Sequence, residues 1–166
     1  GISTTNPTNV TFTSTCGGSV TVSLPIDTFL EVSQLCSTQV VNSTCNGGGL
    51  PGMQQYFYSG IVVLTPPCNT WPASWSLCCR NPAVNATGSG NFTVRSNFNT
   101  VNDPCNNTPV FTAQPIPYVC ANQTVNYNFG VTEFEGDSVV YSLVPAVINA
   151  GGTSITYAGG YSAAQP

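Results

Sequence analysis

The chain has 166 residues, only 5% of them charged, and its formal net charge at pH 7 is -4. It contains two arginines, no lysine and no histidine. These totals exclude imidazole catalysis, histidine metal ligands and lysine nucleophiles. Two arginines cannot follow a nucleic-acid backbone or hold an anionic membrane surface, and no apolar run approaches the length of a membrane span. We therefore expect a non-catalytic protein with no nucleic-acid partner and no membrane insertion.

The surface of this chain must be covered mainly by neutral polar groups. Apolar residues make up 41% of the sequence, which is enough to form a folded core. With so few charges, electrostatic repulsion between copies is weak. The composition therefore favours self-association or packing against neighbouring modules of the same protein.

Short alternating or apolar segments, separated by clusters of Gly, Pro and Asn, predict β-strands along most of the chain. In order, they are residues 10–15, 19–24, 56–65, 74–80, 91–98, 110–113, 124–129, 138–144 and 153–157. The longest, 56–65, is predicted to be a central strand. Residues 27–36 differ, because Phe29, Val32 and Leu35 follow helical spacing and predict one short helix. This pattern is typical of an all-β sandwich.

A polar, turn-forming stretch at residues 102–108 predicts a boundary between two β-sandwich modules in tandem. The first covers residues 1–105 and the second residues 106–166. The second has roughly 60 residues, fewer than the ~100 of a seven-stranded sandwich. Two explanations stay open: the module is incomplete here, or a neighbouring chain completes it by adding a strand.

The cysteine count is even, and no Cys-x-x-Cys pair is present. This pattern predicts up to four disulfides in an oxidising compartment, with a pairing that the sequence leaves open. The vicinal pair is expected to have two different partners, because adjacent strand residues point to opposite faces. The eight cysteines are Cys16, Cys36, Cys45, Cys68, Cys78, Cys79, Cys105 and Cys120.

One acidic cluster is a candidate calcium site. Glu133, Glu135 and Asp137 would lie on one side of an extended segment, where a hard cation relieves their repulsion. Asp103 is the fourth candidate ligand. Nearby oxygens are offered by Asn102, Asn106 and Asn107. The alternative is a solvated acidic turn without a metal.

Two tryptophans lie shortly before the vicinal cysteines Cys78 and Cys79. Trp71 and Trp75 are candidate stacking platforms for a surface glycan, with Asn or Asp side chains fixing the sugar hydroxyls. The alternative is packing of tryptophan against a disulfide, as in immunoglobulin sandwiches, and we favour it. Arg80 is expected to pair with a carboxylate or with carbonyl oxygens.

The sequence from residue 102 to residue 143, NDPCNNTPVF…NYNFGVTEFEGDSVVYSL, resembles cadherin-type repeats. Asn102, Asp103 and the run 107–111 match the linker pattern D-x-N-D-N-x-P-x-F of that family. Glu133, Glu135 and Asp137 stand where the acidic interior motif of the family lies. The resemblance implies an immunoglobulin-like sandwich and adds support to the calcium hypothesis.

A wider set of motifs resembles modules of large secreted surface proteins of Bacteroidota, of the gliding-motility-associated or type IX secretion kind. They are VSQLC, CNGGGLPG, CNTW, SWSLCCRN, PCNNTPVF, PYVCANQTVNYNFG, EGDSVVYSLVPA and YAGGYSA. The resemblance implies an exported adhesin or surface filament, displayed on the cell surface, with no catalytic residues. Ser138 stands in a triplet that resembles the Bacteroidota O-glycosylation acceptor. The alternative functions are a calcium-stiffened or a glycan-binding adhesion module.

Overall fold

The computed structural model describes residues 8–88, 90–114, 118–120 and 122–165. These residues form ten strands and two short 3-10 helices, and no α-helix. The predicted all-β character is confirmed at this level. Alternating and β-branched residues favour strands, and the frequent Gly, Pro and Asn residues interrupt them before they become long.

The chain forms two compact units that interleave along the sequence. Unit 1 consists of Leu24–Ser59 and Asn106–Val139, together with Thr8 of the described residues. Unit 2 consists of Asn9–Ser23, Gly60–Cys105 and Val140–Pro166. The chain passes from unit 2 to unit 1 between Cys105 and Asn106, where the sequence predicts a boundary. The finer prediction of two consecutive sandwich modules stays a prediction.

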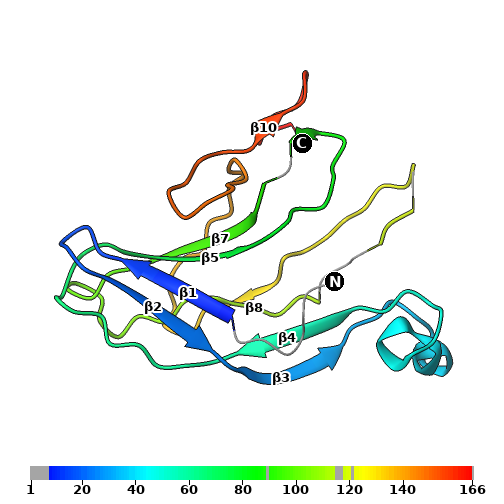
Figure 1. Cartoon of the computed structure of the whole chain (residues 1–166), viewed down its shortest axis with the longest axis horizontal. Coiled ribbons are helices and arrows are strands. Elements are labelled where there is room, and N and C mark those ends of the chain that lie inside the picture. Colours follow the sequence, from blue (N-terminus) through cyan, green and yellow to red (C-terminus); the bar gives the residue numbers. More distant parts are fainter. Residues whose placement is uncertain (1–7, 89, 115–117, 121, 166) are drawn as a thin grey trace. The chain divides into compact units, whose positions relative to one another are not determined.

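Unit 2 is built on a four-stranded sheet with the order β2-β1-β5-β7 (Figure 1). These strands are β1 (Thr8–Thr13), β2 (Ser19–Leu24), β5 (Trp71–Leu77) and β7 (Phe92–Phe98). β5 pairs antiparallel with β1 on one side and with β7 on the other. A second antiparallel pair joins β6 (Ala86–Thr87) to β10 (Thr156–Tyr157). The two edge strands of this sheet are therefore β2 and β7.

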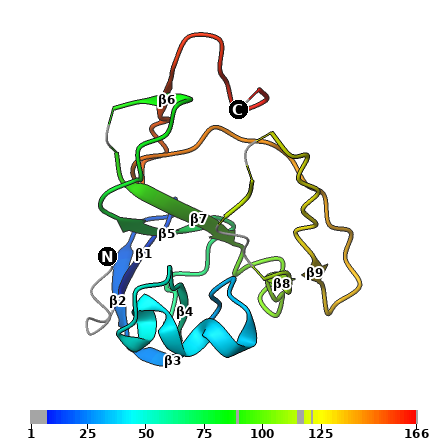
Figure 2. The same cartoon turned by 90° about the vertical axis from the view of Figure 1, so that its right-hand side faces the viewer.

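Unit 1 contains two antiparallel strand pairs and both 3-10 helices. β3 (Ile26–Glu31) pairs with β4 (Gln54–Tyr58), and β8 (Val110–Phe111) pairs with β9 (Val131–Thr132). The helices are η1 (Ser37–Asn42) and η2 (Thr44–Asn46). They lie where β3 ends and β4 begins (Figures 1 and 2).

The helix predicted for residues 27–36 is wrong, because the first half of that segment is β3. Phe29 lies opposite Tyr56 of β4, and their ring centroids are 5.7 Å apart. A cross-strand aromatic pair stabilises a hairpin, and this contact outweighs a helical spacing carried by only three apolar residues. The segment after β3 turns into η1, a 3-10 helix, instead of continuing as an α-helix.

The predicted central strand at residues 56–65 is also wrong. β4 ends at Tyr58 and pairs only with β3 among the described strands. Ile61 and Val63 are 93% and 76% exposed. Beyond Tyr58 no second strand is available to satisfy the backbone, so the apolar run continues as an exposed loop.

The buried core is small for a chain of this length. Of the described apolar residues, those that are buried are Val32, Cys68, Trp71, Ala73 and Ile155. Three of them, Cys68, Trp71 and Ala73, lie in or just before β5. A core this small makes covalent cross-links important for stability.

Candidate functional site

The two tryptophans of β5 differ in what they can do. Trp71 is 1% exposed, and its indole N–H donates to the carbonyl oxygen of Pro66 at 3.2 Å. Its ring and its polar atom are therefore both used by the fold, so Trp71 cannot stack on a sugar. Trp75 is half-buried and packs edge-to-face on Phe92, with ring centroids 6.2 Å apart.

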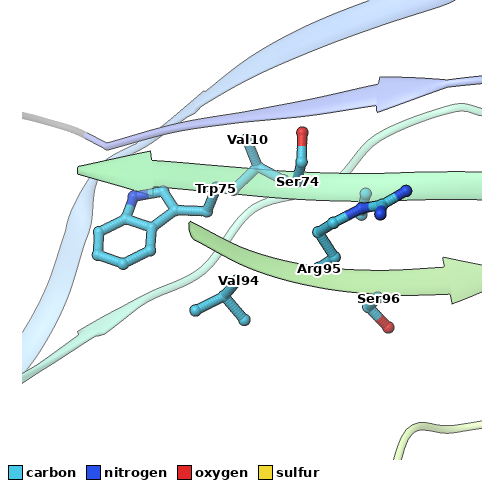
Figure 3. A pocket seen from close by; sticks show the side chains of 7 residues that line it. Val10, Ser74, Trp75, Val94, Arg95 and Ser96 are labelled. Atoms are coloured by element: carbon cyan, nitrogen blue, oxygen red, sulfur yellow. The ribbon is translucent and has the colours of Figure 1, made fainter. Parts of the chain in front are cut away.

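Trp75 borders a shallow hollow of about 150 Å³ on the four-stranded sheet (Figure 3). The strand register sets Trp75 opposite Val94, and sets Ser74 opposite Arg95. Because strand neighbours alternate between faces, the Arg95 side chain projects to the face opposite Trp75. Val10 and Val94 lie beside the indole, and Arg95 and Ser96 are also among the residues that line the hollow. The glycan hypothesis retains Trp75 but gains no cluster of polar groups to fix sugar hydroxyls.

Arg80 contacts a carbonyl group and an aromatic ring. Its Nη2 donates to the carbonyl oxygen of Val147 at 3.2 Å, and the guanidinium carbon lies 5.3 Å from the Phe92 ring centroid. The carbonyl contact agrees with one of the two partners expected from the sequence. These contacts connect the end of β5, the start of β7 and the C-terminal segment within unit 2.

The predicted carboxylate cluster is closed into a turn. Gly136 has φ of +86°, and the segment is not an extended strand, so the predicted arrangement on one side does not form. The Glu133 carboxylate accepts the backbone N–H groups of Glu135 and Asp137 at 3.1 and 2.6 Å. The N–H of Glu135 is the main cause that lowers the pKa of Glu133. The Asn107 side-chain amide donates to Glu135.

The calcium hypothesis stays a prediction from the sequence. Within the described residues, no group of three or more His, Cys, Asp or Glu side chains is placed to hold a metal ion. Asp103 belongs to unit 2, whereas Glu133, Glu135 and Asp137 belong to unit 1. Glu133 uses its oxygens for backbone N–H groups of its own turn. Ser138, the predicted acceptor for a glycan, is exposed directly after this turn.

The cysteines divide into two disulfides and four unpaired residues. Cys16 and Cys68 form a disulfide with an S–S distance of 2.03 Å. Cys78 and Cys79 are bonded to each other, so the expectation of separate partners is wrong. The alternation argument fails because β5 ends at Leu77, one residue before the pair. Cys36, Cys45, Cys105 and Cys120 form no disulfide here.

The clearest candidate for an intermolecular contact is the edge of the sheet in unit 2 together with a nearby part of the chain. β7 is one of the two terminal strands of this sheet, the other being β2, and among the described strands only β5 pairs with it. Its residues Phe92 and Val94 are exposed, so the edge carries apolar side chains. An exposed apolar edge is a template for pairing with another strand.

The second half of this candidate surface is the strand-like segment at residues 138–144. The sequence predicts a strand there, but the structure contains none, and the predicted strand at 124–129 is likewise absent. Val140 is 87% exposed, Leu143 70% and Val144 71%. Apolar side chains that are exposed to water are unfavourable. We call residues 140–144, which are all exposed and lie in unit 2, the exposed segment.

Comparisons with protein-family models, with curated protein sequences and with solved structures found no match for this chain. The resemblance to Bacteroidota surface modules therefore stays a prediction from the motifs. Among the described residues, no helix has the length and apolar character that crossing a membrane requires.

Sequence reasoning missed a polar network around Glu31 in unit 1. One carboxylate oxygen accepts the hydroxyl groups of Ser33 and Ser43 at 2.7 and 2.6 Å, and the other accepts Asn46 Nδ2 at 2.7 Å. Ser43 is completely buried. No periodic pattern marks these residues, because they come from a strand end and two short helices. Only the folded chain brings them together.

Proposed function

We propose that this chain is a structural repeat segment of an extracellular adhesin or surface filament, and that it acts by self-association instead of catalysis. The observation that carries the proposal is the pairing potential of unit 2. In unit 2, β7 is a terminal strand of the four-stranded sheet, and the exposed segment has a strand-like sequence outside the assigned strands. A second copy could pair with either segment by strand addition.

Composition and covalent chemistry support an extracellular location. The Cys16–Cys68 disulfide is of the kind that persists in oxidising compartments. The net charge of -4 is small for 166 residues, so neighbouring copies repel each other weakly. In the proposed assembly, tandem sandwich modules are completed by neighbouring chains, and strand hydrogen bonds carry mechanical load.

Sedimentation velocity over a range of protein concentrations tests this proposal, using Val140→Lys against Val84→Lys. The two valines are 87% and 90% exposed, so the substitutions are matched in chemistry and in solvent exposure. Val140 lies in the exposed segment and Val84 in a loop. We expect the wild type to associate and Val140→Lys to weaken association by about tenfold or more, which corresponds to ~1.4 kcal/mol.

A synthetic peptide with the sequence of residues 138–144 should compete with the assembly and dissociate it. Val84→Lys should assemble like the wild type, because its side chain lies outside both pairing segments. A wild type that stays monomeric at every concentration would contradict the proposal. Equal weakening by Val84→Lys and Val140→Lys would show that general charge, and not strand addition, controls association.

A further inference from the structure

Two cysteines without a disulfide lie on either side of η1 in unit 1. Cys36 immediately precedes η1, and Cys45 is the middle residue of η2. Cys36 is exposed and Cys45 is partly exposed, and neither takes part in a disulfide. They are only nine residues apart in the sequence, so joining them closes a short loop around η1.

The polar network around Glu31 fixes the chain on both sides of these cysteines. A single oxygen of the Glu31 carboxylate accepts hydrogen bonds from Ser33, three residues before Cys36, and from Ser43, two residues before Cys45. Asn46, directly after Cys45, donates to Glu31 and to the carbonyl oxygen of Val40 in η1 at 3.0 Å. The helices therefore fold back onto the end of β3.

The Cys45 sulfur lies close to Gly52, in the segment that leads into β4. A Cβ atom added to Gly52 would lie only 2.6 Å from Cys45 Sγ, so the thiol packs directly against Gly52. The next residue, Met53, donates its N–H to Ser33 Oγ at 2.9 Å and accepts the N–H of Val32 at 2.9 Å. The Cys45 thiol therefore packs against Gly52, and the next residue, Met53, is hydrogen-bonded to the segment that leads into Cys36.

We propose that Cys36 and Cys45 form a disulfide that closes η1 and η2 into a covalent loop. Two thiols are oxidised, losing two electrons and two protons. A small-molecule disulfide such as oxidised glutathione is reduced to two thiols in the same exchange. One cysteine thiolate attacks that disulfide to give a mixed disulfide, and the second thiolate displaces the remaining small thiol. In the cell, this step requires the proposed extracellular location.

Cys120 is the competing partner for Cys36 within unit 1. The backbone N–H of Tyr118 donates to the Gln34 side-chain oxygen at 3.2 Å, which brings the segment before Cys120 to the segment before Cys36. That link is one hydrogen bond from a long side chain, and it joins residues 84 positions apart. The Glu31 network and the Val32–Met53 backbone bond fix the Cys45 side more firmly, so we choose Cys45.

Peptide mapping after oxidation in vitro tests the pairing independently of where the protein resides. The purified chain is incubated with oxidised glutathione, unfolded, alkylated with iodoacetamide without reduction and digested with chymotrypsin. Cleavage after Leu35 and Tyr56 leaves both cysteines in one fragment that contains no other cysteine. We expect this fragment to carry no alkyl group and to gain two hydrogen atoms on later reduction.

The variants Cys36→Ser and Cys105→Ser form a matched pair. Cys36→Ser should expose Cys45 to alkylation, whereas Cys105→Ser should leave the 36–56 fragment protected. Uptake of two alkyl groups by the wild-type fragment would overturn the pairing. So would recovery of this fragment cross-linked to residues 119–127, which contain Cys120. Neither result would affect the self-association experiment, so failure of the disulfide and failure of the proposed function are distinguishable.

Discussion

At the scale of single residues, Glu31 organises unit 1 through its carboxylate. The hydroxyl of Ser43, followed by that of Ser33 and the amide of Asn46, holds the pKa of Glu31 below its ordinary value. These donors stabilise the charged form, so the contacts are strongest when Glu31 is ionised. Because Ser43 is buried, its hydroxyl cannot bond to water in place of the carboxylate if the carboxylate is lost.

We predict that Glu31→Gln lowers the melting temperature at neutral pH. Both carboxylate oxygens of Glu31 accept hydrogen bonds, whereas in a glutamine amide only the oxygen accepts and the NH2 group donates. A pKa lowered in the folded state contributes stability above pH 4.5, the ordinary pKa of this group, and loses it as the pH falls below that value. Circular dichroism melts from pH 7 to pH 3 should show the difference between wild type and variant shrinking with acidification.

The matched control is Asp27→Asn in the same strand, which removes the same charge at an exposed position outside the network. Its melting temperature should stay close to that of the wild type at neutral pH. A Glu31→Gln variant with an unchanged difference from wild type at pH 3 would show that the carboxylate charge is not what the network requires.

At the scale of elements, β5 is the central strand that organises unit 2. It has partners on both sides, it carries the buried Trp71 and Ala73, and it directly follows the disulfide-bonded Cys68. On its other face, the Ser76 and Thr93 hydroxyls are hydrogen-bonded across to β7 at 2.8 Å. By contrast, β7 has one partner among the described strands, and its residues Phe92 and Val94 are exposed.

We predict that Trp71→Ala lowers the free energy of unfolding by about 3–5 kcal/mol, the range for truncation of a large buried aromatic residue. Trp75→Ala should cost about half as much, because Trp75 is only half-buried and leaves a smaller cavity. Urea unfolding followed by circular dichroism measures both. Equal costs for the two variants would contradict the assignment of Trp71 to the core and Trp75 to the surface.

At the scale of the whole molecule, sulfur cross-links compensate for a small core. The Cys16–Cys68 disulfide joins residues 52 positions apart and ties the turn after β1 to the start of β5. Closing a loop of this length restricts the unfolded chain considerably. The low charge of the surface and the terminal position of β7 are the features on which the proposed association with other copies rests.

We predict that the double variant Cys16→Ala/Cys68→Ala is less stable than the wild type by about 4 kcal/mol, the chain-entropy value for this loop length. Cys105→Ala should change stability little, because Cys105 is exposed and forms no disulfide. Chemical denaturation under oxidising conditions measures both variants. A double variant as stable as the wild type would mean that packing, and not the cross-link, maintains unit 2.

Some elements were predictable because local pattern and final environment agree. The alternation of residues 19–24 predicts β2 at its observed bounds, and the predicted strand at 91–98 contains β7. The helical spacing at residues 27–36 gave a wrong prediction, because the strand pairing of Phe29 with Tyr56 decides the conformation there. The Glu31 network could not be predicted, since its members come from segments with no shared periodicity.

The sequence alone determined the all-β class, the polar, weakly charged surface and the absence of histidine and lysine chemistry, since these follow from residue types and local alternation. Only the tertiary structure decided which tryptophan is buried, which cysteines pair and which of the predicted strands form. The physical reason is that strand hydrogen bonds and disulfides join residues far apart in the chain. A strand-like sequence indicates that a segment can pair with another strand, whereas the fold decides whether such a strand lies beside it.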